Sequence, residues 1–222
     1  MKLSRITEIS SWRLHTPSRP WISGLLVSGL LVCFLCANSC GVFEPRQAQT
    51  PEGGSGAAIY QQPQDPEVVI SNLINVITTY PHVNYSELFA DDFVFIPDPD
   101  DVLTLESIYG AGVFADWGAD VEINVGDKLF GDYILALLDL GEGTITEDTD
   151  STYQVLHEYT LDILQNNGWS YYRGAASFRI EQNASDNLWY MSEWRDFRTE
   201  ASDSVGIDGT WGYLKGQIRA TT

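Results

Sequence analysis

The hydrophobic positions between residues 69 and 80 recur every three or four residues, which places them on one face of a helix. Asp65 suits the cap of this helix, and Pro66 suits its first turn. A second, shorter helix is predicted after Asn84, because Asn84 and Glu87 have the spacing of a capping box. The pattern therefore predicts that two helices open the folded part of the chain.

The rest of the chain favours strands. A short apolar segment at 93–96 is predicted to be a strand that ends at the acidic, proline-containing loop 97–101. Alternating segments separated by polar turns predict long strands at 133–145, 152–164, 169–181 and 188–197. A short amphipathic tail follows at 211–219. The expected order is therefore helices first and an antiparallel meander afterwards.

The first forty residues have the order of an export signal. An apolar run at 21–37 follows four basic residues and precedes polar sequence rich in proline and glycine. Cys40, after the small residue Ser39, resembles the lipid-attachment cysteine of bacterial lipoproteins. Three outcomes stay open: cleavage with lipid attachment at Cys40, cleavage without it, and retention as an uncleaved anchor. We divide the chain into a signal or anchor at 1–40, a flexible linker at 41–64, a domain at 65–200 and a tail at 201–222.

The part that would be exported is strongly acidic. The whole chain has a formal net charge of −19, and residues 1–40 hold four basic groups and one acidic group, so the remainder carries −22. Such a charge repels nucleic acid and anionic lipid headgroups, and we expect neither as a partner. No cysteine follows Cys40, so the domain is expected to rely on an ordinary core without a disulfide.

Three segments carry a resemblance to a known superfamily: ELFADDFVFIPD at 87–98, ASFRIEQNASDNLWYMSEWRDF at 176–197 and TWGYLKGQIR at 210–219. The chain resembles the nuclear transport factor 2-like superfamily, which includes SnoaL-like and ketosteroid-isomerase-like domains. The third segment is similar to the end of uncharacterised bacterial lipoproteins of that superfamily. The resemblance implies an α+β fold: a cone-shaped, strongly curved antiparallel sheet wrapped around N-terminal helices, the cystatin-like roll.

Residues 103–130 are the segment where local pattern and resemblance differ. Val121, Ile123 and Val125 alternate as in a strand, yet the segment ends in the helix-like sequence DKLF, so the local pattern leaves both structures open. The resemblance implies that a third helix lies at 119–130.

One face of the strand 152–164 carries a candidate for acid–base chemistry. Because side chains alternate across a strand, Tyr153, His157 and Tyr159 share that face with three aliphatic residues. His157 could act as a general base while a tyrosine hydroxyl stabilises an enolate oxygen. The alternative is a buried histidine hydrogen-bonded to a neighbour, which is the commoner role.

Asp196 is a second acid–base candidate. It shares a strand face with Trp194, whereas Trp189 lies on the opposite face, and the pattern gives both faces an equal claim to be interior. An ion pair between Asp196 and an arginine such as Arg173 or Arg179 is the alternative. The predicted ligand pocket consists of Tyr153, His157, Tyr159, Trp189 and Trp194.

No metal site or cofactor is predicted. The acidic loops at 98–101 and 147–150 lack the alternating ligands and the turn-forming glycine of a calcium loop, so they are interpreted as solvated acidic turns. Only His82 and His157 follow Cys40, too few for a typical zinc or iron site. Nucleophile-elbow, phosphate-loop and dinucleotide motifs are absent from the sequence.

These observations favour an envelope-tethered domain that binds a small apolar ligand or a protein partner without catalysis. The N-terminal segment would hold it to the membrane on the extracytoplasmic side. The alternative is an acid–base isomerase or dehydratase that uses His157 with Tyr153 or Tyr159. A homodimer is compatible with either function.

Overall fold

The computed structural model describes residues 60–79, 82 and 84–221. The predicted signal or anchor, Cys40 and nearly all of the predicted linker lie outside these residues. Within the part of the chain that is described, none of the helices combines the length and the apolar character needed to cross a membrane.

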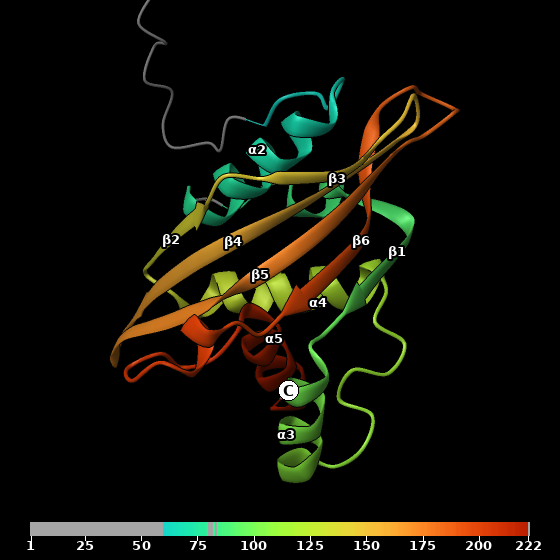
Figure 1. The fold of residues 1–222 in the computed structure, drawn as a ribbon. Helices are drawn as coiled ribbons and strands as arrows, with labels where there is room; N and C mark the ends of the chain where they lie inside the picture. The colour runs from blue at the N-terminus through green and yellow to red at the C-terminus, as the bar shows by residue number, and fades with distance from the viewer. Residues whose placement is uncertain (1–59, 80–81, 83, 222) are drawn as a thin grey trace, which may run out of the picture. The chain divides into compact units, whose positions relative to one another are not determined.

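The described residues form one α+β unit (Figure 1). Its helical elements are α2 (Pro66–Thr78), the 3₁₀ helix η2 (Tyr85–Leu88), α3 (Pro99–Tyr109), α4 (Ala119–Asp132), the 3₁₀ helix η3 (Glu200–Asp203) and α5 (Trp211–Ala220). Its strands are β1 (Phe89–Ile96), β2 (Leu135–Leu140), β3 (Thr144–Asp148), β4 (Thr152–Gln165), β5 (Gly168–Gln182) and β6 (Trp189–Phe197). The predicted fold class is confirmed: the six strands make one curved, unclosed sheet against the helices.

The sheet has the strand order β1-β6-β5-β4-β2, and β3 also pairs with β4. β1 runs parallel to β6, whereas the other pairs are antiparallel. The single strand expected at 133–145 is wrong, because β2 and β3 pair with successive parts of β4. Their break lies at Gly141 and Gly143, and a Cβ on Gly143 would stand 2.6 Å from Cε1 of His157.

The core lies on the face of the sheet that α2, α4 and α5 cover, which we call the inner face (Figure 1). The helical spacing predicted for α2 is confirmed, since Val69, Leu73, Val76 and Ile77 are all buried. The alternation predicted for β4 is confirmed as well, with Tyr153, Val155, Tyr159, Leu161 and Ile163 in the core. The opposite face of the sheet is called the outer face below.

The helices between β1 and β2 were only partly predicted. The helix implied by the resemblance is confirmed as α4, but α3 replaces the expected solvated turn at 97–101. Pro99 starts α3, and the carboxylate of Asp98 caps it by accepting a hydrogen bond from the N–H of Asp100. Asp101 then turns inward and is fully buried. The strand ends before this segment as predicted, but the proline and acidic residues then begin a helix instead of a solvated turn.

The capping box expected at Asn84 is also wrong. Asn84 has φ = 72° and makes no side-chain capping bond, and the segment after it is a single 3₁₀ turn. A left-handed residue cannot present its side chain to the following N–H groups as an extended cap residue does.

Candidate functional site

The N-terminus of α5 is fixed to the inner face by polar groups of the sheet. The N–H of Trp211 donates to the Tyr159 hydroxyl at 2.8 Å, and the N–H of Gly212 donates to Oδ2 of Asp196 at 2.6 Å. The hydroxyl of Thr210 accepts from the N–H of Tyr213. Three first-turn donors, which a helix cannot satisfy internally, are therefore paired.

Asp196 is the most perturbed carboxyl group of this region. Its side chain is fully buried, and burial raises its pKa from 3.8 to about 7, although Gly212, Tyr159 and the charge of Lys215 act in the opposite direction. Its Oδ1 atom has no hydrogen-bond partner among the described residues. Burial and the nearby Asp196 also raise the pKa of Tyr159 well above its ordinary value.

A buried charge pair joins α5 to α4. Nζ of Lys215 lies 2.7 Å from Oε1 of Glu122, and both side chains are almost completely inaccessible to solvent. Glu122 also accepts hydrogen bonds from the Tyr85 hydroxyl at 2.6 Å and from Nε1 of Trp117 at 2.9 Å. Nζ lies 3.2 Å from the ring centroid of Trp194, and burial lowers the pKa of Lys215. These side chains occupy the space between α5 and the inner face.

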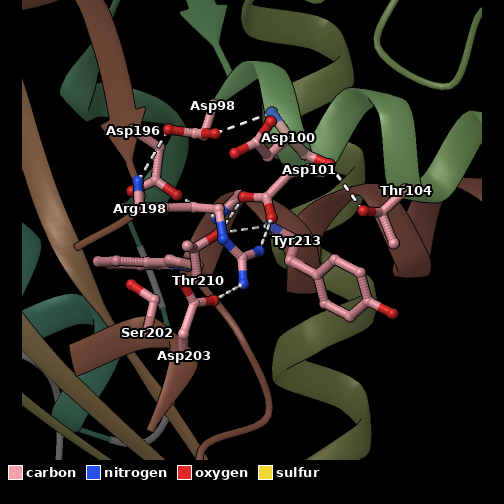
Figure 2. Close-up of polar contacts among 12 residues, drawn as sticks. Asp98, Asp100, Asp101, Thr104, Asp196, Arg198, Ser202, Asp203, Thr210 and Tyr213 are labelled. Atoms are coloured by element: carbon pink, nitrogen blue, oxygen red, sulfur yellow. Dashed lines mark hydrogen bonds and ion pairs between the residues drawn. The ribbon is translucent and has the colours of Figure 1, made fainter. Parts of the chain in front are cut away.

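A third polar cluster lies where α3, α5 and the end of β6 meet. Figure 2 shows the guanidinium of Arg198 reaching between two carboxylates, with N–O distances of 2.5 Å to Asp101 and 2.5 Å to Asp203. Thr210 donates its hydroxyl to Asp101, and the N–H of Arg198 donates to Asp98. Burial raises the pKa of Asp101, although the Thr210 and Arg198 hydrogen bonds lower it. The cluster ties both helix N-termini to the sheet.

The structure brings some of the sequence candidates together and separates others. Tyr159 and Asp196 meet at the start of α5, as described above. His157 is half-buried, and its Nδ1 atom lies 2.8 Å from the Gly141 carbonyl oxygen. It pairs with Ala176, which pairs with Asp196, so His157 is two strands, or about 10 Å, from Asp196.

The remaining predicted pocket residues, Tyr153, Trp189 and Trp194, are buried in the hydrophobic core. The predicted alternative for Asp196 is wrong. Arg173 pairs with Asp162, and Arg179 pairs with Glu147 and Glu181.

Two open grooves lie on the outer face, and two residues of the clusters described above, Tyr159 and Arg198, contribute to their linings. Groove 1, of about 500 Å³, is lined by residues that include Asp139, Glu158, Thr160, Arg173, Gly174 and Thr199. Groove 2, of about 660 Å³, is lined by residues that include Gln154, Leu156, Ala175, Ser177, Phe197 and Thr199. Thr199 borders both grooves. Of the five residues predicted for a pocket, Tyr159 alone lines either groove, and it lines groove 1.

The buried residues Glu122, Lys215 and Asp101 and the partly buried Arg198 were not predicted as special residues. Two of them carry a weak signal in the sequence. Lys215 stands alone as a charge within the aromatic segment TWGYLKG, and Glu122 interrupts the apolar run from 121 to 125. Both charges replace apolar residues on a face that turns out to be interior.

These elements form the α+β fold, a curved and unclosed sheet with helices against it, that the resemblance to the nuclear transport factor 2-like superfamily implies. No family model and no curated protein matches the sequence. Among solved structures, the chain is similar to a proposed aromatic ring hydroxylase from Novosphingobium aromaticivorans, with 14% identity over 69% of this chain and 99% of the other, at a TM-score of 0.48.

Two further structures resemble the chain to a similar degree. A proposed scytalone dehydratase from Novosphingobium aromaticivorans has 11% identity over 60% of this chain and 80% of its own, at a TM-score of 0.48. A nuclear transport factor 2-like protein of unknown function in nutrient uptake from Rhodospirillum rubrum has 10% identity over 61% of this chain and 98% of its own, at a TM-score of 0.47. At these values the similarities say nothing about the activity or the ligand of this chain.

Proposed function

We propose that this protein is a non-catalytic binding domain, tethered in the cell envelope, and that it holds a small ligand or a partner segment in the grooves of its outer face. The observation that carries the proposal is the contrast between the two faces. The carboxyl group of Asp196 is fully buried and its Oδ2 atom accepts from the first turn of α5, whereas the two outer-face grooves are open and lined by both polar and apolar groups.

The same contrast argues against an acid–base enzyme. A general base must reach the proton that it removes. Asp196 and Tyr159 have the perturbed pKa values that acid–base chemistry exploits, but Oδ2 of Asp196 and the hydroxyl of Tyr159 hold the first turn of α5, and Asp196 lines neither groove. His157 lines neither groove and bonds to a backbone carbonyl. These contacts support a structural role for the three residues.

Blocking groove 1 tests the proposal. Thr160 is exposed on the outer face, so Thr160→Trp places a large ring in the groove without disturbing the core. A ligand at a hundredfold excess over its Kd stabilises a protein by about 2.7 kcal/mol, which corresponds to about 5–10 °C in Tm. In a thermal-unfolding screen of the full chain in detergent, we expect the variant to lose the shift that small uncharged compounds give the parent.

The matched control is Thr144→Trp, which adds the same ring to an exposed threonine of β3 outside both grooves. It should keep the full shift. If both variants keep the full thermal shift of the parent, the ligand binds outside groove 1. Isomerase or dehydratase turnover that disappears in His157→Ala would contradict the proposal as a whole.

The tether makes a separate prediction. If the chain is cleaved before Cys40 and lipidated there, the mature protein begins with a lipid-modified cysteine and fractionates with membranes. Cys40→Ser then stays unprocessed or becomes soluble, because a serine has no thiol to modify. Mass spectrometry of the mature N-terminus and membrane fractionation measure both results. An intact Met1 on the membrane-bound protein would instead show an uncleaved anchor.

A further inference from the structure

The outer face carries an exposed apolar area beside groove 1. Strand register sets out three successive rows across β2, β4 and β5. From the β4–β5 turn, the rows are Leu135–Leu164–Trp169, Leu137–Asp162–Tyr171 and Asp139–Thr160–Arg173. The first two rows are rich in apolar and aromatic side chains, and the third lines groove 1. Apolar surface therefore leads directly into the groove.

The side chains of the first two rows are accessible to a ligand. Trp169 is 41% exposed and Leu137 is 49% exposed, whereas Trp117, Trp189, Trp194 and Trp211 are buried. The rings of Trp169 and Tyr171 are nearly parallel, with 17° between their planes and 6.5 Å between their centroids. The exposed ring of Trp169 and the half-buried ring of Tyr171 therefore offer aromatic surface on one side of the sheet.

Hydrogen-bonding groups accompany the rings along the same path. The guanidinium of Arg173 lies 5.9 Å from the ring centroid of Tyr171. Its Nη1 atom forms an ion pair with Oδ1 of Asp162 at 2.6 Å. Groove 1 adds carboxylates and hydroxyls, and groove 2 adds an amide, hydroxyls, a carboxylate and a guanidinium group. Because the grooves share Thr199, the path continues from Trp169 to Ser177 over eight residues of β5, or about 27 Å.

This combination selects among possible occupants. A polyanion would meet Asp139, Glu158 and Asp162, and the part of the chain after residue 40 carries a formal charge of −22. A second copy of the chain would bring the same carboxylates against one another. A hydrocarbon chain would leave the charged groups without partners. A sugar ring, in contrast, has a face of C–H bonds for an aromatic ring and an edge of hydroxyls for carboxylates, amides and guanidinium groups.

We propose that the outer face binds an uncharged oligosaccharide, which packs on Trp169 and Tyr171 and extends through groove 1 toward groove 2. The inference rests on the proposed function, because it names the ligand class of the same grooves. The aromatic pair anchors one end of the chain of sugars, and the polar groups of β4 and β5 bind the hydroxyls of the next rings.

Binding is measured on the full chain in detergent by calorimetry, with N-acetylchitotetraose and cellohexaose as uncharged probes and polygalacturonate as the anionic comparison. We expect one of the uncharged probes to bind and the polyanion not to bind. Trp169→Ala and Tyr171→Ala should each weaken the affinity at least tenfold. Leu103→Ala is the control, because Leu103 is 69% exposed on α3 and lies outside these rows. It should leave the affinity unchanged.

A second readout reports on the aromatic pair itself. The bound probe should protect the acrylamide-quenchable tryptophan emission of the parent, and Trp169→Phe should remove that protected fraction. Affinity that is unchanged in both alanine variants, or equal binding of polygalacturonate, overturns the inference. A dimer that becomes monomeric in Trp169→Ala also overturns it, since the rings would then form a self-interface.

The two proposals fail in distinguishable ways. Suppose that neither uncharged probe binds but that Thr160→Trp still removes the thermal shift given by another compound. The oligosaccharide proposal is then wrong, and the groove proposal stands. If no compound or probe stabilises the parent, both are wrong. If Thr160→Trp weakens oligosaccharide binding as strongly as Trp169→Ala does, both proposals are supported.

Discussion

Lys215→Met is expected to lower the free energy of unfolding by about 3–5 kcal/mol, because it leaves the carboxylate of Glu122 buried without a cation. Methionine matches the length of the lysine stem, so the packing against Trp194 is largely kept and the lost charge dominates. Tyr85 and Trp117 still donate to Glu122, but two neutral donors do not replace an ammonium at 2.7 Å. Urea unfolding of the full chain in detergent measures the change.

A double variant separates the charge from the packing. In Lys215→Met with Glu122→Gln, no buried charge is left at this place, and the glutamine oxygen can still accept from Tyr85 or Trp117. We expect most of the lost stability to return, since replacing a complete buried pair is often close to neutral. Lys128→Met is the control: Lys128 is partly exposed, and its loss should change stability by less than about 0.5 kcal/mol. A loss below about 1 kcal/mol in Lys215→Met alone would contradict the ion pair.

Glu122 and Lys215 also illustrate what a sequence conceals. Helix spacing in α2 and strand alternation in β4 are local patterns. Both were predicted correctly because each depends only on residues that are close together in the sequence. A buried ion pair is not a local pattern. Nor is a buried hydrogen bond such as that between Thr210 and Asp101, which joins residues 109 positions apart. Glu122 and Lys215 each look like an ordinary surface charge until tertiary packing places the partner beside it.

The last strand shows a different reason for an incomplete prediction. The alternation in β6 left both faces of the strand as candidates for the interior, and each face is interior in a different part of the strand. Arg179 pairs with Glu193 and Ile180 pairs with Met191, so Ser192 is an extra residue in β6. This bulge reverses the alternation: Met191 points inward before it, and Trp194 points inward after it. Conflicting alternation within one strand was therefore itself evidence for a bulge.

The bulge is also what places Asp196 in the interior, and its burial predicts how stability depends on pH. The pKa of Asp196 rises from 3.8 to about 7. The unfolded chain releases this proton near pH 4, whereas the folded domain retains it until about pH 7. Between these values the unfolded chain binds fewer protons, so the free energy of unfolding falls as pH rises, by up to about 4 kcal/mol across the window, and levels off above it.

Asp196→Asn removes the titrating proton and keeps an oxygen that can accept from the N–H of Gly212. We therefore expect the variant and the parent to be about equally stable near pH 4, and the variant to be more stable by up to about 4 kcal/mol at pH 8. The measurement is urea unfolding of both proteins at each pH unit from 4 to 8. The raised pKa of Asp101 acts with the same sign, but it cancels in the difference between the two proteins.

The control is Asp139→Asn, which removes a carboxylate that is exposed on β2. Its stability difference from the parent should stay within about 0.5 kcal/mol at every pH, because this group is solvated in both states. A constant difference between the parent and Asp196→Asn from pH 4 to 8 would mean that Asp196 does not titrate in this range. In that case Lys215 and the N-terminus of α5 would stabilise the ionised carboxylate of Asp196 by more than its burial destabilises it.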